Sequence, residues 1–152
     1  MKGSCDVVTL TEDIINHTGT CITFGADKVT FDCQGHEIDG NNTGHGIYMN
    51  GRSNNTIKDC VVSEFEEGIY LNSSGHNVIT NNIANFNNWS GIELRHSSNN
   101  TVTNNTANNN SVGIYLYSCS NSTLLNNTAN SNTCGIRLDY SSNDELDDNT
   151  AC

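Results

Sequence analysis

The 152-residue sequence contains no proline, few aromatic side chains (7%), and only six Lys+Arg against seventeen Asp+Glu. The lack of proline suits a chain of hydrogen-bonded strands, because proline cannot donate to a strand ladder. The net charge of -11 argues against nucleic acid and anionic membranes as partners, since both are bound through basic patches. No apolar run approaches the length of a transmembrane helix, so membrane insertion is not expected. Met1–Ser4 is not followed by the apolar region of a secretion signal.

One four-residue pattern recurs at regular intervals. Gly68-Ile69-Tyr70-Leu71 returns unchanged at residue 113 and with one change at residues 91 and 135, and an earlier copy starts at residue 46. These starts are 22 or 23 residues apart. An Asn-rich turn followed by a small residue keeps the same interval, as in Asn104-Asn105-Thr106-Ala107. A fixed period in the twenties, made of short β-like pieces, indicates a solenoid.

The apolar residues within one unit alternate over very short runs, which is strand periodicity, and no unit contains a helical pattern. The solenoid is therefore expected to be a coil of strands only. With neighbouring turns about 4.8 Å apart, like residues stack on like. In one turn the inward residues are predicted to be Val102, Asn105, Ala107, Asn110, Ile114 and Leu116.

Two of the stacked columns consist of asparagine. A buried amide is costly unless it is hydrogen-bonded, and stacked asparagines can bond to one another and to the turn backbone. We therefore favour corner ladders over a binding surface for these columns. The first contains Asn82, Asn105, Asn127 and Asn149, with Cys60 in the turn above, and the second contains Asn87, Asn110 and Asn132.

These residues carry a resemblance to a known family. The G-I-Y-L and N-N-x-V-x-N-N-x-A patterns, preceded by Val29-Thr30-Phe31-Asp32-Cys33-Gln34-Gly35-His36, resemble the right-handed parallel β-helix repeats of the pectin-lyase-like superfamily. The similarity is greatest to its CASH or NosD-like branch, common in archaeal surface proteins, and covers roughly residues 22–151. It implies an all-β, single-stranded right-handed parallel β-helix of about six turns. As a guide to function it is weak, because the fold carries lyases, hydrolases, adhesins and inert stalks.

The two ends depart from the repeat. Residues 1–21 are expected to form an N-terminal cap, with one helical turn starting at an N-cap Thr11, and residues 22–152 to form the β-helix. The last turn stops at residues 148–152, and no capping segment is expected after it. Either the natural chain is longer, or a second copy stacks head to tail on this end and builds a filament.

Seven cysteines point to an oxidising compartment, and no C-x-x-C or Cys/His cluster suggests a metal site instead. Cys5 is expected to pair with Cys21, and Cys33 with Cys60, which lies in the neighbouring turn. Cys119, Cys134 and Cys152 have no partner in their columns and are candidates for intermolecular bonds. Glycosylation sequons, which also favour an extracellular or cell-surface location, begin at Asn16, Asn41, Asn54, Asn72, Asn88, Asn99, Asn104, Asn109, Asn121 and Asn126.

No catalytic residues are expected. Gly44-His45-Gly46 matches a tripeptide of polygalacturonases, but their N-T-D and R-I-K motifs are absent, and the match is interpreted as coincidence. Glu64, Glu66 and Glu67 share one turn and are interpreted as a solvated acidic loop. The histidines fall in different columns, which argues against a copper site because metal ligands must converge.

Two surface features remain as candidate sites. The outward column Tyr48, Tyr70, Glu93, Tyr115 and Arg137 could bind sugars, with Tyr117 and Trp89 as further contacts. The acidic residues Asp144, Asp147 and Asp148 could bind Ca²⁺ through their oxygen atoms.

The favoured function is a non-enzymatic, extracellular structural module that self-assembles. Carbohydrate binding to surface glycans through the tyrosine face is the alternative, and a polysaccharide lyase or hydrolase is third. No resident cofactor is expected.

Overall fold

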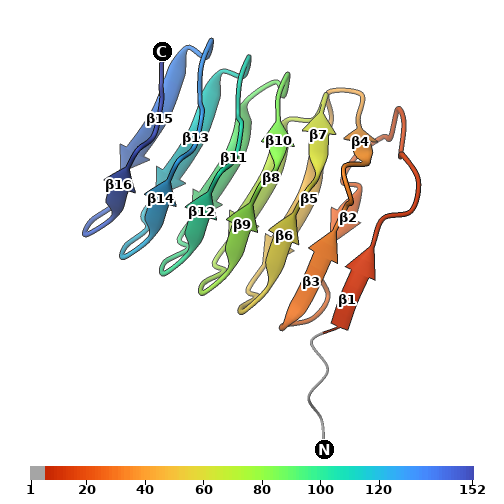
Figure 1. The fold of residues 1–152 in the computed structure, drawn as a ribbon, viewed down its shortest axis with the longest axis horizontal. Helices are drawn as coiled ribbons and strands as arrows, with labels where there is room; N and C mark the ends of the chain where they lie inside the picture. The colour runs from red at the N-terminus through yellow and green to blue at the C-terminus, as the bar shows by residue number, and fades with distance from the viewer. Residues whose placement is uncertain (1–5) are drawn as a thin grey trace, which may run out of the picture.

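The computed structural model describes residues 6–152, which form sixteen β-strands and no helix. The strands coil into a parallel β-helix whose turns stack side by side from β1 to β16 along the long axis of the molecule (Figure 1). The fold class predicted from the repeat, an all-β solenoid of about six turns, is confirmed. No segment of residues 6–152 forms a helix with the length and apolar character that crossing a bilayer requires.

Three parallel sheets form the walls of the coil. Sheet A contains β1 (Asp6–Thr9), β3 (Val29–Asp32), β6 (Thr56–Lys58), β9 (Val78–Thr80), β12 (Thr101–Thr103), β14 (Thr123–Leu125) and β16 (Glu145–Asp147). Sheet B contains β4 (Glu37–Asp39), β7 (Val61–Ser63) and β10 (Ile83–Ala84). Sheet C contains β2 (Ile22–Thr23), β5 (His45–Asn50), β8 (Glu67–Asn72), β11 (Ser90–Arg95), β13 (Val112–Tyr117) and β15 (Cys134–Asp139).

The strand register places identical or similar residues on top of one another. In sheet C, Ile69 pairs with Ile92, which pairs with Ile114 on the next strand. These side chains are fully buried, as are the other apolar residues predicted to face inward, so the core is a narrow column along the axis. The repeated glycine has a packing reason: a Cβ on Gly91 would lie 2.6 Å from the Ala84 carbonyl oxygen and 2.8 Å from Asn110 Nδ2.

Both predicted asparagine ladders are present. The Asn82 backbone N–H donates to Asn105 Oδ1 at 2.9 Å, while Asn105 Nδ2 donates to the Ile79 carbonyl oxygen and to Asn127 Oδ1. The second ladder follows the same scheme, with the Asn87 N–H donating to Asn110 Oδ1 at 2.8 Å. Each amide therefore satisfies backbone groups at a corner where the strand pairing is interrupted.

A third asparagine ladder was not predicted from the sequence. It contains Asn55, Asn77 and Asn100, and continues through Ser122 to Asp144. The Asn77 N–H donates to Asn100 Oδ1 at 2.8 Å, and Asn100 Nδ2 donates to the Ser74 carbonyl oxygen.

The residue before each ladder position turns the corner in a left-handed backbone conformation. Asn104, with φ of 56°, precedes Asn105, and Asn54, with φ of 59°, precedes Asn55. Asparagine adopts this conformation more readily than most residues. The Asn-Asn pairs thus combine an exposed turn residue with a buried ladder residue.

The predicted helical turn at Thr11 is wrong. Residues 6–21 instead form an irregular additional turn of the coil, in which β1 pairs with β3 and Ile14 forms a bridge to Ile38. The Leu10 and His17 N–H groups donate to carbonyl oxygens of the next turn, at Asp32 and Asp39. These bonds replace the local bonds of a helix, because the neighbouring edge offers backbone acceptors along its whole length.

The Cys33–Cys60 disulfide is present between stacked turns, with 4.7 Å between the Cα atoms. Cys21 is a free, half-buried thiol, and its predicted partner Cys5 lies outside the described residues. Cys134 is half-buried and Cys152 is exposed. Cys119 is buried, and its thiol donates to the Leu94 carbonyl oxygen, so the prediction that it bonds to another molecule is wrong for the folded chain.

Candidate functional site

The outer face of sheet C carries a dense set of aromatic and charged side chains. Because the isoleucines and leucines of each strand point inward, the residues between and after them point outward. The register aligns two outward columns across five strands. They are Tyr48, Tyr70, Glu93, Tyr115 and Arg137, as predicted, and Asn50, Asn72, Arg95, Tyr117 and Asp139 beside them.

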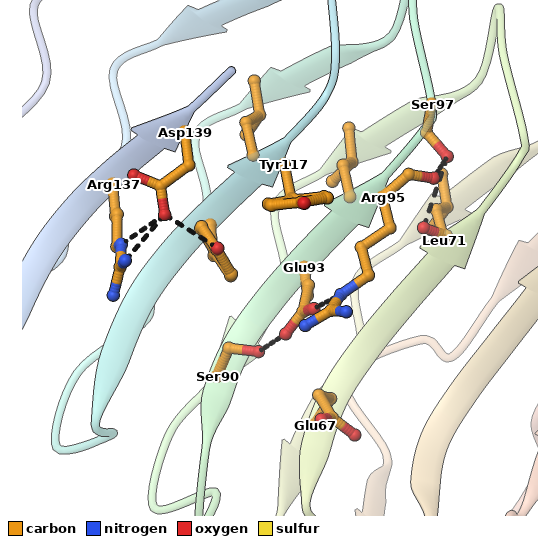
Figure 2. Close-up of polar contacts among 12 residues, drawn as sticks. Glu67, Leu71, Ser90, Glu93, Arg95, Ser97, Tyr117, Arg137 and Asp139 are labelled. Atoms are coloured by element: carbon orange, nitrogen blue, oxygen red, sulfur yellow. Dashed lines mark hydrogen bonds and ion pairs between the residues drawn. The ribbon is translucent and has the colours of Figure 1, made fainter. Parts of the chain in front are cut away.

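Glu93 lies at the centre of this face and is only 1% exposed, although the sequence suggested an exposed column. Its carboxylate accepts hydrogen bonds from Ser90 Oγ at 2.7 Å and from Arg95 Nε (Figure 2). A buried carboxylate is tolerated only when it is paired and hydrogen-bonded. The bond to Glu93 in turn raises the pKa of Arg95, which stays a cation. Glu93 and Arg95, which we call the Glu93–Arg95 unit, are therefore a fixed polar element in the middle of sheet C.

A second polar cluster joins the two strands that follow. Arg137 donates to Asp139 Oδ2 from Nε and Nη2, at 2.8 and 2.7 Å, and the Tyr115 hydroxyl donates to the same oxygen at 2.9 Å. The bonds from Arg137 and Tyr115 lower the pKa of Asp139. The Arg137 guanidinium also lies over the Tyr115 ring, 5.1 Å from its centroid. Tyr115 is therefore buried, at 5% exposure, and the prediction that it is an exposed sugar-stacking ring is wrong.

At the other end of the face, His45 connects two half-buried tyrosines. Its Nδ1 lies 2.7 Å from Glu67 Oε2, and its ring lies 5.1 Å from Tyr48 and 4.8 Å from Tyr70. Glu67 is the first residue of β8, with its side chain 17% exposed, so its interpretation as part of a solvated loop is wrong. We call His45, Tyr48, Glu67 and Tyr70 the β5–β8 cluster.

A further aromatic group lies where the strands of sheet C end. Tyr117 makes edge contacts with His96 and with Tyr140, at centroid distances of 5.7 and 5.5 Å. The Arg95 guanidinium lies over the Tyr117 ring, 5.4 Å from its centroid. We call His96, Tyr117 and Tyr140 the β13–β15 cluster. Tyr140 is 84% exposed, whereas the predicted contact Trp89 lies in the turn before β11 and is 39% exposed.

A concave surface lies at the corner between sheets A and B. It is a cavity of 440 Å³ lined by Asp32, Gln34, Gly35, Asp59, Cys60, Val61, Asn81 and Ile83. Lys58 Nζ lies 2.6 Å from Asp32 and 3.1 Å from Asp59, so both carboxylates are paired with the one cation. Nothing in the cavity extends this ion pair into a wider site.

The predicted calcium ligands are not brought together. Asp144 continues the third ladder, where its Oδ1 accepts the Ser122 N–H, whereas Asp147 is on the outer face of sheet A and Asp148 turns the next corner. Within residues 6–152, no three His, Cys, Asp or Glu side chains gather as a metal ion would require. The structure does not support the calcium alternative.

The predicted glycosylation asparagines lie mainly at exposed corners. Asn72 differs, because it is half-buried and its side chain donates to Asn50. The exposed ones are Asn16, Asn41, Asn54, Asn88, Asn99, Asn104, Asn109, Asn121 and Asn126. Their modification stays a prediction.

A family model described as "Periplasmic copper-binding protein (NosD)" matches residues 4–151. The chain belongs to the NosD family. This match confirms the resemblance to a family of right-handed β-helix proteins. In a separate comparison, no curated protein matches the chain. With the disulfide, the periplasmic family confirms the predicted location, at the cell surface or otherwise outside the cytoplasm.

Two solved structures share the fold of this NosD-family chain. A double mutant of the periplasmic alginate epimerase AlgG is 24% identical, with a TM-score of 0.69 over 94% of the chain. The enzymatically active domain of tailspike protein 2 from bacteriophage CBA120 is 13% identical, with a TM-score of 0.68 over 88% of the chain. The chain spans 31% of the epimerase chain and 22% of the tailspike chain.

The copper in the family's description does not fit the described residues. Copper is usually bound by imidazole or soft sulfur ligands that converge on one point. Here His45 is bonded to Glu67, His36 to Asp13, and His96 packs on Tyr117. These imidazoles belong to three separate clusters, so we assign no copper ligands.

Proposed function

We propose that this NosD-family chain is a non-enzymatic, extracellular β-helix rod that binds carbohydrate on the outer face of sheet C. The observation that supports it is the concentration of aromatic and paired charged side chains on this one wall. The outward positions of sheet A, in contrast, include many threonines, as at Thr101, Thr103 and Thr123.

The chemistry of the sheet C face suits sugars. A sugar ring presents C–H groups on its faces and hydroxyl groups around its edge, so it is bound by aromatic rings together with hydrogen-bonding groups that are held in place. Tyr48 and Tyr70 lie 5.5 Å apart and offer an aromatic surface with hydroxyl groups at its edge. Glu67 and Arg95 lie on the same face. The Glu67 carboxylate can accept hydrogen bonds from sugar hydroxyls, and the Arg95 guanidinium can donate to them.

The protonation states argue for binding rather than catalysis. A carboxyl group that serves as a general acid needs a pKa raised towards neutrality. On this face the pKa of Asp139 is lowered by Arg137 and Tyr115, and Glu93 accepts hydrogen bonds from Ser90 and Arg95. Burial raises the pKa values of Tyr70 and Tyr115, which makes both phenols weaker acids and keeps them in the protonated form. The two structural neighbours are enzymes by name, but the likeness to them is one of fold.

Affinity electrophoresis through gels that contain soluble polysaccharides tests this proposal. Binding should retard the native protein, and Tyr48→Ala/Tyr70→Ala should abolish the retardation. Thr101→Ala/Thr103→Ala, on the opposite wall, is the control and should behave as wild type. If no polysaccharide retards the wild type, carbohydrate binding is excluded. If the tyrosine variant is retarded normally, the ligand lies on another face.

Head-to-tail association of rods is the second part of the proposal. Strands β1 and β16 each pair on one side only within residues 6–152. Residues there that occupy inward positions of the register are exposed, Val8 by 49% and Leu146 by 46%. Acidic residues flank both ends, so association should strengthen as salt screens their repulsion. Sedimentation velocity between low and high salt measures this, and a monomer at every concentration and salt would contradict it.

A further inference from the structure

Resting on the proposed function, we infer that the sheet C face recognises an uncharged glycan and discriminates against uronate polymers. The inference depends on how the charged groups of the face are paired. Both arginines that could meet a sugar carboxylate are already committed to protein carboxylates.

Arg95 is held by Glu93, which is buried beneath it and cannot turn away. Arg137 is held by two hydrogen bonds to a single oxygen of Asp139, and Tyr115 donates to the same oxygen. A carboxylate on the ligand could reach only a guanidinium whose charge is already compensated, and it would gain the full charge of an arginine only by breaking one of these pairs. Breaking a pair whose partner is buried is costly, because it leaves the carboxylate uncompensated.

The remaining charge on the face is negative. Glu67, Glu93 and Asp139 oppose only Arg95 and Arg137, and the whole chain carries a net charge of -11. An anionic polymer would therefore be repelled both at long range and in contact. A neutral sugar avoids this cost, and its hydroxyls can still donate to the carboxylate oxygens.

The spacing of the aromatic groups suits an extended chain along the axis of the coil. The β5–β8 cluster and the β13–β15 cluster lie at opposite ends of the face, with the Glu93–Arg95 unit on β11 between them. Tyr70 on β8 and Tyr117 on β13 are two strand steps apart, which corresponds to about 10 Å along the axis. A single sugar ring is too short to contact both clusters, so the ligand is expected to be an oligosaccharide or a polymer.

The test compares neutral and uronate polymers on matched charge variants. Hydroxyethylcellulose and galactomannan serve as neutral probes, and polygalacturonate and alginate as uronate probes. The wild type should bind a neutral probe at least about tenfold more tightly than either uronate, which is the effect of roughly one uncompensated charge contact. Asp139→Asn, which keeps an acceptor for Tyr115 but frees the charge of Arg137, should raise uronate affinity about tenfold.

Asp147→Asn is the control, since it makes the same change in net charge on sheet A and should leave uronate binding unchanged. If the wild type binds uronates as tightly as neutral probes, the inference is overturned while the proposed function stands. If Asp139→Asn and Asp147→Asn raise uronate binding equally, the pairing on this face does not set the preference, and the inference is likewise overturned. Binding to no probe would overturn the proposed function itself.

Discussion

The ladder residue Asn105 offers the sharpest test of what holds the coil together. Its side chain is 1% exposed and makes four hydrogen bonds. Substitution to alanine would leave the buried Asn82 N–H without a partner and remove one donor to the Ile79 carbonyl oxygen. The side-chain amides of Asn82 and Asn127 would each keep one other partner. Asn82 Nδ2 still donates to the Ile57 carbonyl oxygen, and Asn127 Oδ1 still accepts from the backbone N–H of residue 105.

The magnitude follows from these losses. An orphaned buried N–H costs about 1–3 kcal/mol, and each further amide bond that is lost contributes about 1 kcal/mol. We therefore expect Asn105→Ala to lower the free energy of unfolding by about 2–4 kcal/mol, from the orphaned N–H and the lost bond to Ile79, a large part of the 5–15 kcal/mol typical of a domain. Asn149→Ala should cost less, about 1–2 kcal/mol, because that residue is half-buried and makes three hydrogen bonds instead of four.

Urea denaturation followed by circular dichroism measures these differences, and hydrogen exchange at the Asn82 N–H reports the ladder bond itself. Asn104→Gly is the matched control, since Asn104 is the exposed neighbour with φ of 56°, a conformation that glycine adopts freely. Its stability should stay within about 0.5 kcal/mol of wild type. If Asn105→Ala were equally mild, or if the Asn82 N–H stayed protected, the ladder would not be a principal stabilising element.

Four further predictions concern other parts of the coil. Asp144→Asn should stabilise the chain by about 1 kcal/mol. Asp144 Oδ2 is buried without a partner, whereas at the equivalent position of the same ladder the Asn100 side chain has Nδ2, which donates a hydrogen bond. Urea denaturation measures the change, and an unchanged midpoint would count against this. Removing the disulfide with Cys33→Ala/Cys60→Ala should cost about 3.5 kcal/mol on the chain-entropy model, given a sequence separation of 27, and thermal denaturation without reductant measures it. The pKa values of Asp32 and Asp139 are lowered, by bonds from Lys58 and the Gln34 N–H and by bonds from Arg137 and Tyr115. The stabilisation that the ionised Asp32 and Asp139 give the folded chain is therefore complete above their unfolded pKa of about 4, and it is lost as the pH falls through their lower pKa values in the folded state. The urea midpoint should drop in that pH window, and it should drop less in Asp32→Asn/Asp139→Asn. Cu(II) titration followed by electron paramagnetic resonance should show no stoichiometric site, and a one-to-one signal with several nitrogen ligands would refute the separation of the histidines.

The sequence was sufficient to predict the coil because the repeat itself encodes the stacking. A strict period of 22 or 23 residues places each inward residue on its counterpart, so Ile114, Leu116 and the Asn105 column followed from spacing alone. The same register located the Cys33–Cys60 bond.

What the sequence did not reveal depends on contacts that break the repeat. Glu93 occupies a position held by tyrosine in three other turns, and its burial arises from Ser90 and Arg95 rather than from the period. Tyr115 is covered only because Arg137 and Asp139 occur in the next turn. The local preference for a helical turn at Thr11 was outweighed by backbone pairing with the neighbouring turn.

The corner geometry also bears on how the chain ages chemically. Deamidation of asparagine begins when the backbone nitrogen of the next residue attacks the side-chain amide. At Asn104 and Asn121 that nitrogen belongs to Asn105 and Ser122, and its hydrogen is donated to the following turn. The attacking atom is therefore buried and held away from its target. A sequence with so many Asn-Asn and Asn-Ser pairs would resist this damage while the coil is wound, and would become vulnerable wherever a turn opens.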